Sequence, residues 1–226
     1  MEKIELKNKI IKVAYKLFAK KGYEKTTIAE IIEEVGTSKG GFYHHFRSKE
    51  EIIEKITFSH IEKIKLYHIE LLENKKIKFI EKFILPYHKV AEMKKDNVIN
   101  WSEISNIYNF DGNHILFKKM ADAFQEEVKL FYYKLITEGN KSGDCYTKNP
   151  KEIASLWGRE VLEFHRVARN LLYEEEAKEE NFYNLVRFNQ DLINHLLNLK
   201  NEKIDLVSFG KEYISNLKLT FGKKNN

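Results

Sequence analysis

The sequence has very little cysteine and very little proline. Cys145 is the single cysteine among 226 residues, so one chain cannot form a disulfide and holds no CxxC metal-binding pair. Two prolines and ten glycines leave little room for flexible linkers. No run approaches the roughly 18 apolar residues of a membrane-spanning helix, and the charged N-terminus lacks the apolar centre of a secretion signal. We therefore expect a reduced, cytoplasmic protein with no membrane partner.

Helical periodicity runs through almost the whole chain. Apolar residues recur at spacings of three and four and strand-type alternation is scarce, so we predict an all-α fold of about nine to ten helices. The net charge is only +5, but twelve Lys and Arg against nine Asp and Glu fall within the first 55 residues. This local excess of positive charge is weak evidence for a polyanionic partner. The expected helices cover about residues 5–21, 27–35, 38–45, 48–72, 76–95, 100–108, 114–138, 150–173, 179–199 and 204–219.

The first three of these helices have the spacing of a helix-turn-helix. Gly22 stands where the first helix ends, and Gly36 allows the sharp turn before the third. Thr27, three residues before Glu30, opens the second helix with a capping box. The second and third helices are short and marginal alone, so they must pack on the first. We expect their shared core to comprise Phe18, Ile28, Ile31, Val35, Phe42 and Phe46.

The third helix begins with small residues, in the run TSKGGFYHHF at positions 37–46. A helix that enters the major groove meets base edges with its N-terminal residues. Gly40 and Gly41 have no side chains to hold the backbone away from DNA. Ser38 and Lys39 can reach bases or phosphate oxygens. We therefore interpret the glycines as a loss of helix stability that permits close approach to duplex DNA.

The aromatic and imidazole residues that follow divide between core and surface. We expect Phe42 to face inward and Tyr43 to project towards a thymine methyl group or a phosphate. His44, His45 and Lys49 can contact the DNA backbone. Adjacent histidines point about 100° apart on a helix, and no third ligand lies at i+4, so we expect no metal site.

These features together resemble the DNA-binding region of the tetracycline-repressor (TetR) family of bacterial transcription regulators. The matching positions are Leu17-Phe18, Gly22-Tyr23, Thr27-Ile28, Ile31, the run Val35-Gly36-Thr37-Ser38-Lys39-Gly40-Gly41-Phe42-Tyr43-His44-His45-Phe46, and Ser48-Lys49-Glu50-Glu51. They cover about the first 55 residues, and the remainder is similar only in length and helical character. The resemblance implies a helix-turn-helix DNA-binding domain at residues 1–55 and a larger helical ligand-binding and dimerisation domain at residues 56–226.

The resemblance also implies roles for individual residues. Thr27 would contact phosphate, and His45 and Lys49 would contact the DNA backbone. Ala29 departs from the pattern because it is too short to reach a base from the second helix, so specificity would depend partly on DNA shape. The positions that would face the groove are Ser38, Lys39, Gly40, Gly41 and Tyr43.

The later helices carry many aromatic residues, most of which are typical of a core. As a set they could also line an inducer pocket. The pocket candidates are Trp101, Phe124, Tyr132, Trp157, His165 and Arg169. Arg166 shares a helix face with His165 and Arg169, and the three could receive an acidic ligand group. A salt bridge to Glu163 or to residues 174–176 is the more ordinary fate of these arginines.

The family pattern makes the last two helices the dimer interface, although their apolar stripes could equally be internal core. We expect a dimeric repressor that a small-molecule inducer releases from a palindromic operator. An activator, or a helical enzyme or ligand carrier, is the alternative. The sequence shows no catalytic triad, carboxylate pair or phosphate-cradling glycine loop, so we expect no enzyme and no cofactor. Cys145 lies in a polar Ser-Gly-Asp loop and is expected to be exposed, which leaves redox sensing open.

Overall fold

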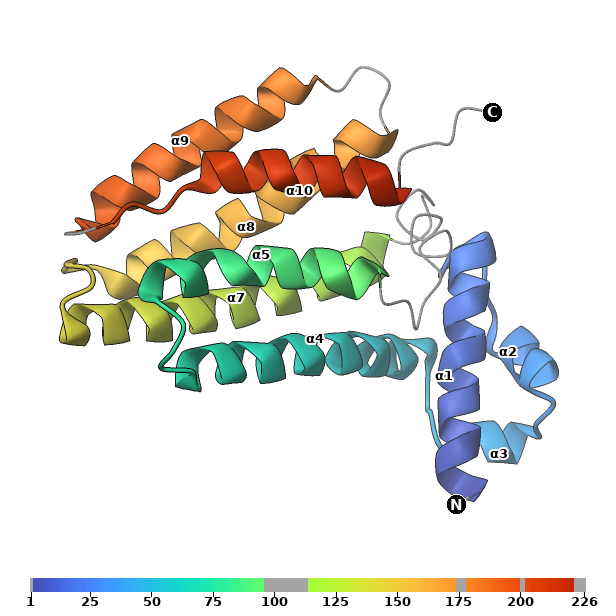
Figure 1. Ribbon diagram of the computed structural model, residues 1–226. Coiled ribbons are helices and arrows are strands. Elements are labelled where there is room, and N and C mark those ends of the chain that lie inside the picture. Colours follow the sequence, from blue (N-terminus) through green and yellow to red (C-terminus); the bar gives the residue numbers. More distant parts are fainter. Residues whose placement is uncertain (1, 96–113, 174–177, 200–201, 222–226) are drawn as a thin grey trace. The chain divides into compact units, whose positions relative to one another are not determined.

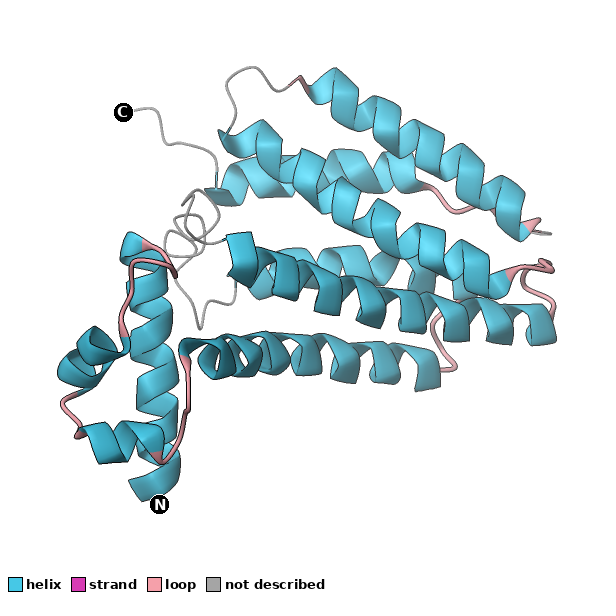
Figure 2. Ribbon diagram, turned by 180° about the vertical axis from the view of Figure 1, so that it is seen from behind, coloured by secondary structure: helices cyan, strands magenta, loops and turns pink. Residues whose placement is uncertain are grey.

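Every regular element in the described part of the chain is a helix (Figures 1 and 2), which confirms the all-α prediction. The computed structural model describes residues 2–95, 114–173, 178–199 and 202–221. The helices are α1 (Glu2–Lys21), α2 (Ile28–Val35), α3 (Lys39–Tyr43), α4 (Lys49–Glu73), α5 (Phe79–Lys95), α7 (His114–Ser142), α8 (Pro150–Tyr173), α9 (Glu179–Leu197) and α10 (Leu206–Phe221). The helix expected near residues 100–108 lies outside the described residues.

Contacts divide the chain into two compact units. One unit takes in residues 1–63 and 97–124, and the other takes in residues 64–96 and 125–226. Helix α4 continues from the first unit into the second without a break. The boundary expected between residues 55 and 56 stays a prediction.

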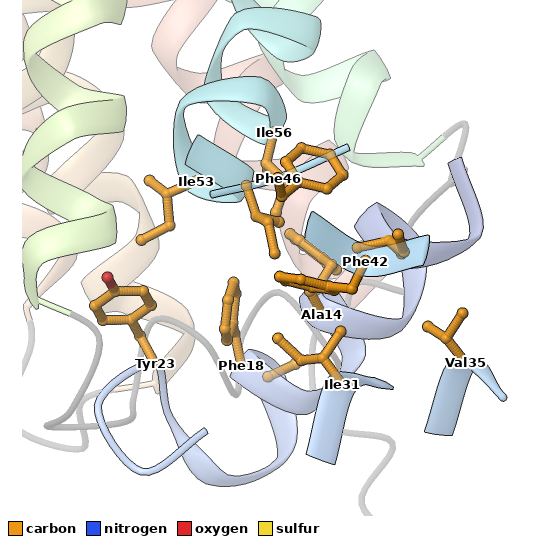
Figure 3. Close-up of a cluster of buried hydrophobic side chains, with 13 residues drawn as sticks. Ala14, Phe18, Tyr23, Ile31, Val35, Phe42, Phe46, Ile53 and Ile56 are labelled. Carbon is orange, nitrogen blue, oxygen red and sulfur yellow. The ribbon is translucent and has the colours of Figure 1, made fainter. Parts of the chain in front are cut away.

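The core of the first unit is built from four helices (Figure 3). Five of the six residues expected there are buried, and Ile28 is half-buried against them. Helix α1 adds Ile10 and Ala14, which have no exposed surface. The sequence-based list missed α4, whose Ile52, Ile53 and Ile56 are at most 2% exposed. The first two turns of α4 therefore close the helix-turn-helix core rather than merely follow it.

The second unit is held together by an aromatic layer between α5, α7 and α8. The Phe83 ring lies 4.6 Å from the Tyr132 ring and 5.3 Å from the Trp157 ring, measured between centroids. The Tyr132 hydroxyl donates a hydrogen bond of 2.8 Å to the Phe83 carbonyl. Helices α9 and α10 approach closely, since a Cβ on Gly210 would lie 3.2 Å from Val186 Cγ1.

The loop after α7 corrects one expectation. Cys145 is only 2% exposed, so the prediction of an exposed thiol is wrong. The Asn140 side chain of α7 holds the backbone of this loop against the helix: Asn140 Nδ2 donates to the Thr147 carbonyl at 2.8 Å, and the Thr147 N–H donates to Asn140 Oδ1 at 3.0 Å. Burial raises the pKa of the Cys145 thiol from 9.0 to about 11, which disfavours the reactive thiolate.

Candidate nucleic-acid interface

Helix α2 begins with the predicted capping box. The Glu30 N–H donates to Thr27 Oγ1 at 3.2 Å, and the Thr27 N–H donates to Glu30 Oε2 at 2.8 Å. Lys21 forms an ion pair with Glu30. This ion pair, together with the hydrogen bonds from Thr27, lowers the pKa of Glu30 from 4.5 to about 2. The Thr27 side chain is exposed, but its hydroxyl also donates to Glu30 Oε2 at 2.8 Å. A phosphate that contacts Thr27 would compete with Glu30 for this hydroxyl.

The turn between α2 and α3 has the backbone geometry that the sequence predicts. Gly36 has φ +69°, in the left-handed region that glycine adopts without strain. Its N–H donates to the Ile32 and Glu33 carbonyls, both at 3.0 Å, and the Thr37 N–H donates to the Ile32 carbonyl at 3.2 Å. These bonds satisfy the last carbonyls of α2 and set the direction in which α3 leaves.

Helix α3 starts at the predicted cap and presents an open backbone. Ser38 Oγ accepts a 3.0 Å hydrogen bond from the Gly41 N–H. Gly40 is exposed, and a Cβ placed on it would have only Ser38 Oγ nearby, at 3.8 Å. A Cβ on Gly41 would lie 2.5 Å from Thr37 Oγ1. Packing within the chain therefore explains the glycine at 41 but not the glycine at 40.

The residues after the glycines alternate between core and surface as expected. Phe42 is fully buried, whereas Tyr43 is 49% exposed. The helix ends at Tyr43, two residues earlier than predicted, and His44 caps it. His44 is exposed and His45 half-buried, with ring centroids 5.0 Å apart. Lys39 is also exposed, so the polar candidates on α3 lie on the surface of the first unit.

Lys49 departs from its expected surroundings. Its Nζ donates to the carbonyls of Tyr23 at 2.8 Å and Thr26 at 2.7 Å, within the α1–α2 loop. No local sequence pattern indicates this contact, because Lys49 and its partners are separated by more than twenty positions. Arg47, which the sequence reasoning passed over, is exposed in the turn between α3 and α4. The signal that could have identified it was a basic residue just before Ser48, whose Oγ accepts a hydrogen bond from the Glu51 N–H in the first turn of α4 at 3.4 Å.

Of the residues expected to form an inducer pocket, the structure describes the side chains of Phe124, Tyr132, Trp157 and His165. Tyr132 and Trp157 are fully buried in the aromatic layer, and Phe124 is half-buried. His165 Nδ1 lies 3.1 Å from the Tyr213 hydroxyl. Trp101 lies outside the described residues, as does the side chain of Arg169.

Two further features belong to the second unit. Arg166 forms the expected salt bridge with Glu163, at 2.5 Å. An open depression of about 580 Å³ lies between the start of α8 and the end of α9, lined by Thr147, Asn149, Glu152, Ile153, Leu156, His195 and Leu196. None of the pocket candidates lines it.

The described residues show neither a membrane-spanning helix nor a metal site. None of their helices combines the length and apolar character that crossing a bilayer requires. Within the same residues, no group of three or more His, Cys, Asp and Glu side chains could hold a metal ion.

Comparison with known proteins points to one family. Residues 10–56 match the family described as bacterial regulatory proteins, tetR family. YerO of Bacillus subtilis (strain 168), an uncharacterized HTH-type transcriptional regulator, is 34% identical over 137 residues, which span 61% of this chain and 44% of YerO. The HTH-type transcriptional regulator QacR of Staphylococcus aureus (strain Mu50) is also 34% identical over 137 residues, which span 51% of this chain and 71% of QacR. The chain thus matches less than half of YerO but most of QacR.

The fold is shared with solved structures at lower identity. A TetR-family transcriptional regulator from Pectobacterium atrosepticum superposes with a TM-score of 0.57 and 21% identity. The superposition covers 87% of this chain and 96% of that chain. The likeness therefore extends beyond the first 56 residues and includes the helices of the second unit.

Proposed function

Since this chain belongs to the TetR family of bacterial regulatory proteins, we propose that it is a dimeric repressor, released from a palindromic operator by a small-molecule inducer. Its relatives are transcriptional regulators rather than enzymes. The observation that carries the proposal is the open backbone at Gly40, where the chain has space for a side chain and carries none. Lys39 directly before it and Tyr43 three residues after it are both exposed.

In this proposal α3 enters the major groove, with Gly40 against the base edges. Ser38, Lys39 and Tyr43 would supply contacts to bases and phosphates. Thr27 at the start of α2 and His45 after α3 would contact the DNA backbone. Ala29 cannot reach a base, so the reading of sequence would rest on α3 and on DNA shape.

The proposed dimer uses α9 more than α10. The apolar stripe of α10 is used inside the chain, since Phe209, Tyr213 and Leu217 are at most 5% exposed. Helix α9 buries one stripe and carries a second beside it, formed by Leu185, Phe188, Leu192 and Leu196. Phe188 is 62% exposed. A two-fold axis through this stripe would bury it against its own copy and present two α3 helices to a palindrome.

The proposed inducer would act on the aromatic layer of the second unit. Tyr132 and Trp157 pack tightly on Phe83, so a ligand entering there has to separate these rings. The neighbouring Phe131 ring stacks on His68 of α4, with centroids 4.3 Å apart. A displacement of α7 would therefore be passed to α4, whose first two turns belong to the helix-turn-helix core.

A gel-shift assay with the DNA upstream of the protein's own gene tests the proposal. We expect the wild-type protein to retard this DNA, and Tyr43→Ala to abolish the retardation because the exposed contact on α3 is lost. Tyr133→Ala is the matched control, since Tyr133 is 40% exposed on α7, and it should bind as the wild type does. A folded wild-type dimer that binds no DNA at low salt would remove the proposal.

A reporter assay distinguishes repression from activation. Deleting the gene should raise expression from the promoter that the protein binds, and restoring it should lower expression. A fall on deletion would make the protein an activator.

A further inference from the structure

Lys49, the first residue of α4, is fully engaged inside the chain. Its Nζ donates to the carbonyls of Thr26 at 2.7 Å, Tyr23 at 2.8 Å and Glu24 at 3.4 Å. A lysine ammonium has three N–H donors, so these three carbonyls use all of them. The same Nζ lies 4.4 Å from the centroid of the Tyr23 ring. No N–H of this group is left to bind a DNA phosphate while the contacts hold.

The next residue of α4 reinforces the same attachment. Glu50 Oε1 accepts a 2.5 Å hydrogen bond from the Tyr23 hydroxyl, and Tyr23 is only 4% exposed. This bond is the main reason that the pKa of Glu50 is lowered. The first turn of α4 thus holds Tyr23 by its hydroxyl through Glu50 and by its carbonyl through Lys49.

The loop that these side chains hold leads directly into α2. The Thr26 side chain is fully buried, and its hydroxyl donates to the Gly22 carbonyl at 2.7 Å. The Thr26 N–H donates to the Tyr23 carbonyl at 3.3 Å. Thr27, the N-cap of α2, follows at once. The loop is therefore internally closed, and fixing its carbonyls fixes where Thr27 and the start of α2 lie.

We propose that Lys49 is a positioning residue of the DNA-binding unit. It ties the α1–α2 loop, and with it Thr27, to the first turn of α4, and it donates no hydrogen bond to DNA. A displacement of the start of α4 is therefore carried to the start of α2 through the loop. This inference rests on the proposed DNA binding and replaces the direct phosphate contact that the family resemblance implied for Lys49.

The salt dependence of DNA binding separates positioning from phosphate contact. Each phosphate contact contributes about 0.9 to the slope of log Kobs against log salt concentration. Fluorescence anisotropy with a labelled random-sequence duplex of about 30 base pairs measures this slope without knowledge of the operator. Lys49→Met should weaken binding about tenfold and leave the slope unchanged, because it moves Thr27 but removes no phosphate contact. Lys39→Met, at an exposed position of α3, is the matched control. It should make the negative slope less steep by about 0.9.

A double-mutant cycle with Thr27→Ala distinguishes positioning from a general loss of stability. The affinities are measured well below the unfolding temperature of every variant, so that all are folded. If Lys49 places Thr27, the two losses are not additive, and Thr27→Ala costs about threefold less affinity in the Lys49→Met background. Additive losses overturn the proposal. It is also overturned if Lys49→Met makes the salt slope less steep by about 0.9, or if Lys49→Met binds DNA with unchanged affinity.

Lys49→Arg provides a second test if Lys49→Met does not fold. Arginine keeps the charge, so a phosphate contact would survive the exchange with little change in affinity. Three carbonyls that converge on one ammonium do not fit a planar guanidinium. A positioning role therefore predicts that Lys49→Arg loses DNA affinity clearly while its salt slope stays constant. Full DNA affinity in Lys49→Arg overturns the proposal. A wild-type protein that binds no duplex at low salt removes the proposed function itself, which is a different outcome from any of these.

Discussion

Replacing Gly40 with alanine should stabilise the free protein. An alanine within a helix is favoured over glycine by about 0.5–1 kcal/mol, because glycine loses more backbone freedom on folding. The added Cβ would lie 3.8 Å from Ser38 Oγ, an ordinary van der Waals contact, so no clash offsets the gain. In a protein of this size the unfolding midpoint of the transition that includes α3 should rise by about 1–4 °C. Differential scanning fluorimetry measures this rise.

The same change should weaken DNA binding. If the α3 backbone lies against base edges, a methyl group on Gly40 lifts the helix and lengthens the contacts made by its neighbours. Losing two hydrogen bonds, of Ser38 and Lys39, at about 1 kcal/mol each weakens binding about thirtyfold. Anisotropy titrations with the DNA retarded in the gel shift measure this loss. The prediction is thus a variant that is more stable and binds DNA less well.

The other glycines of the region serve as controls for stability. Gly41→Ala should destabilise the protein, because its Cβ would meet Thr37 Oγ1 at 2.5 Å unless that side chain moves. Gly36→Ala should also destabilise it, by about 1–2 kcal/mol, since alanine is strained at φ +69° although no atom lies within 4 Å. A stabilised Gly40→Ala variant that binds DNA with wild-type affinity would refute the approach of α3 to the bases.

Three further predictions concern acid stability, thiol reactivity and assembly. The pKa of Glu30 is lowered to about 2, mainly by Lys21, so the stability that its carboxylate contributes is present above pH 4.5 and lost as the pH falls towards 2. Glu30→Gln should therefore flatten the pH dependence of the urea unfolding midpoint between pH 4.5 and 2. An unchanged pH profile contradicts this prediction. With a pKa of about 11 instead of 9.0, Cys145 holds roughly a hundredfold less thiolate; iodoacetamide at pH 8, followed by mass spectrometry, should modify the native protein at least that much more slowly than the urea-unfolded chain, and equal rates would be inconsistent with burial. If the proposed dimer forms through α9, Phe188→Glu should convert it to monomer in sedimentation velocity, whereas Leu219→Glu, at an 82% exposed position of α10, should not. An intact Phe188→Glu dimer excludes the α9 interface.

The helix-turn-helix was predictable because its signals are local. The capping box of Thr27 and Glu30, the left-handed Gly36 and the Ser38 cap each depend on residues within four positions, and the structure has all three. The alternation of buried Phe42 and exposed Tyr43 follows from helical periodicity in the same way. Short-range chemistry therefore determines both the elements and the surface that the unit presents.

Contacts between distant positions could not be predicted in this way. From the sequence, Lys49 is expected to be a surface cation beside the turn. In the structure its hydrogen-bond partners lie 23 to 26 positions earlier in the chain. Cys145 reads as exposed because its neighbours are polar, but those neighbours bond to α7 and to α9, where the Tyr146 N–H donates to the Leu197 carbonyl at 2.8 Å. In both cases polar neighbours in the sequence led to the expectation of an exposed side chain. In the fold these polar groups instead form hydrogen bonds with one another.

The last two helices show why a strong apolar pattern leaves burial and assembly undistinguished. A helix packed on one side needs a single apolar stripe, and α10 has that, with Ser208, Lys211 and Glu212 on its exposed surface. Helix α9 has two stripes about 100° apart, and the one through Val186 and Ile193 is enough for the chain itself. In the second stripe Phe188 is 62% exposed and Leu185, Leu192 and Leu196 are only half-buried, and apolar surface left in water costs about 25 cal/mol per Å². The apolar surface that this stripe still exposes, mainly at Phe188, is therefore the physical argument for the proposed second copy of the chain on α9.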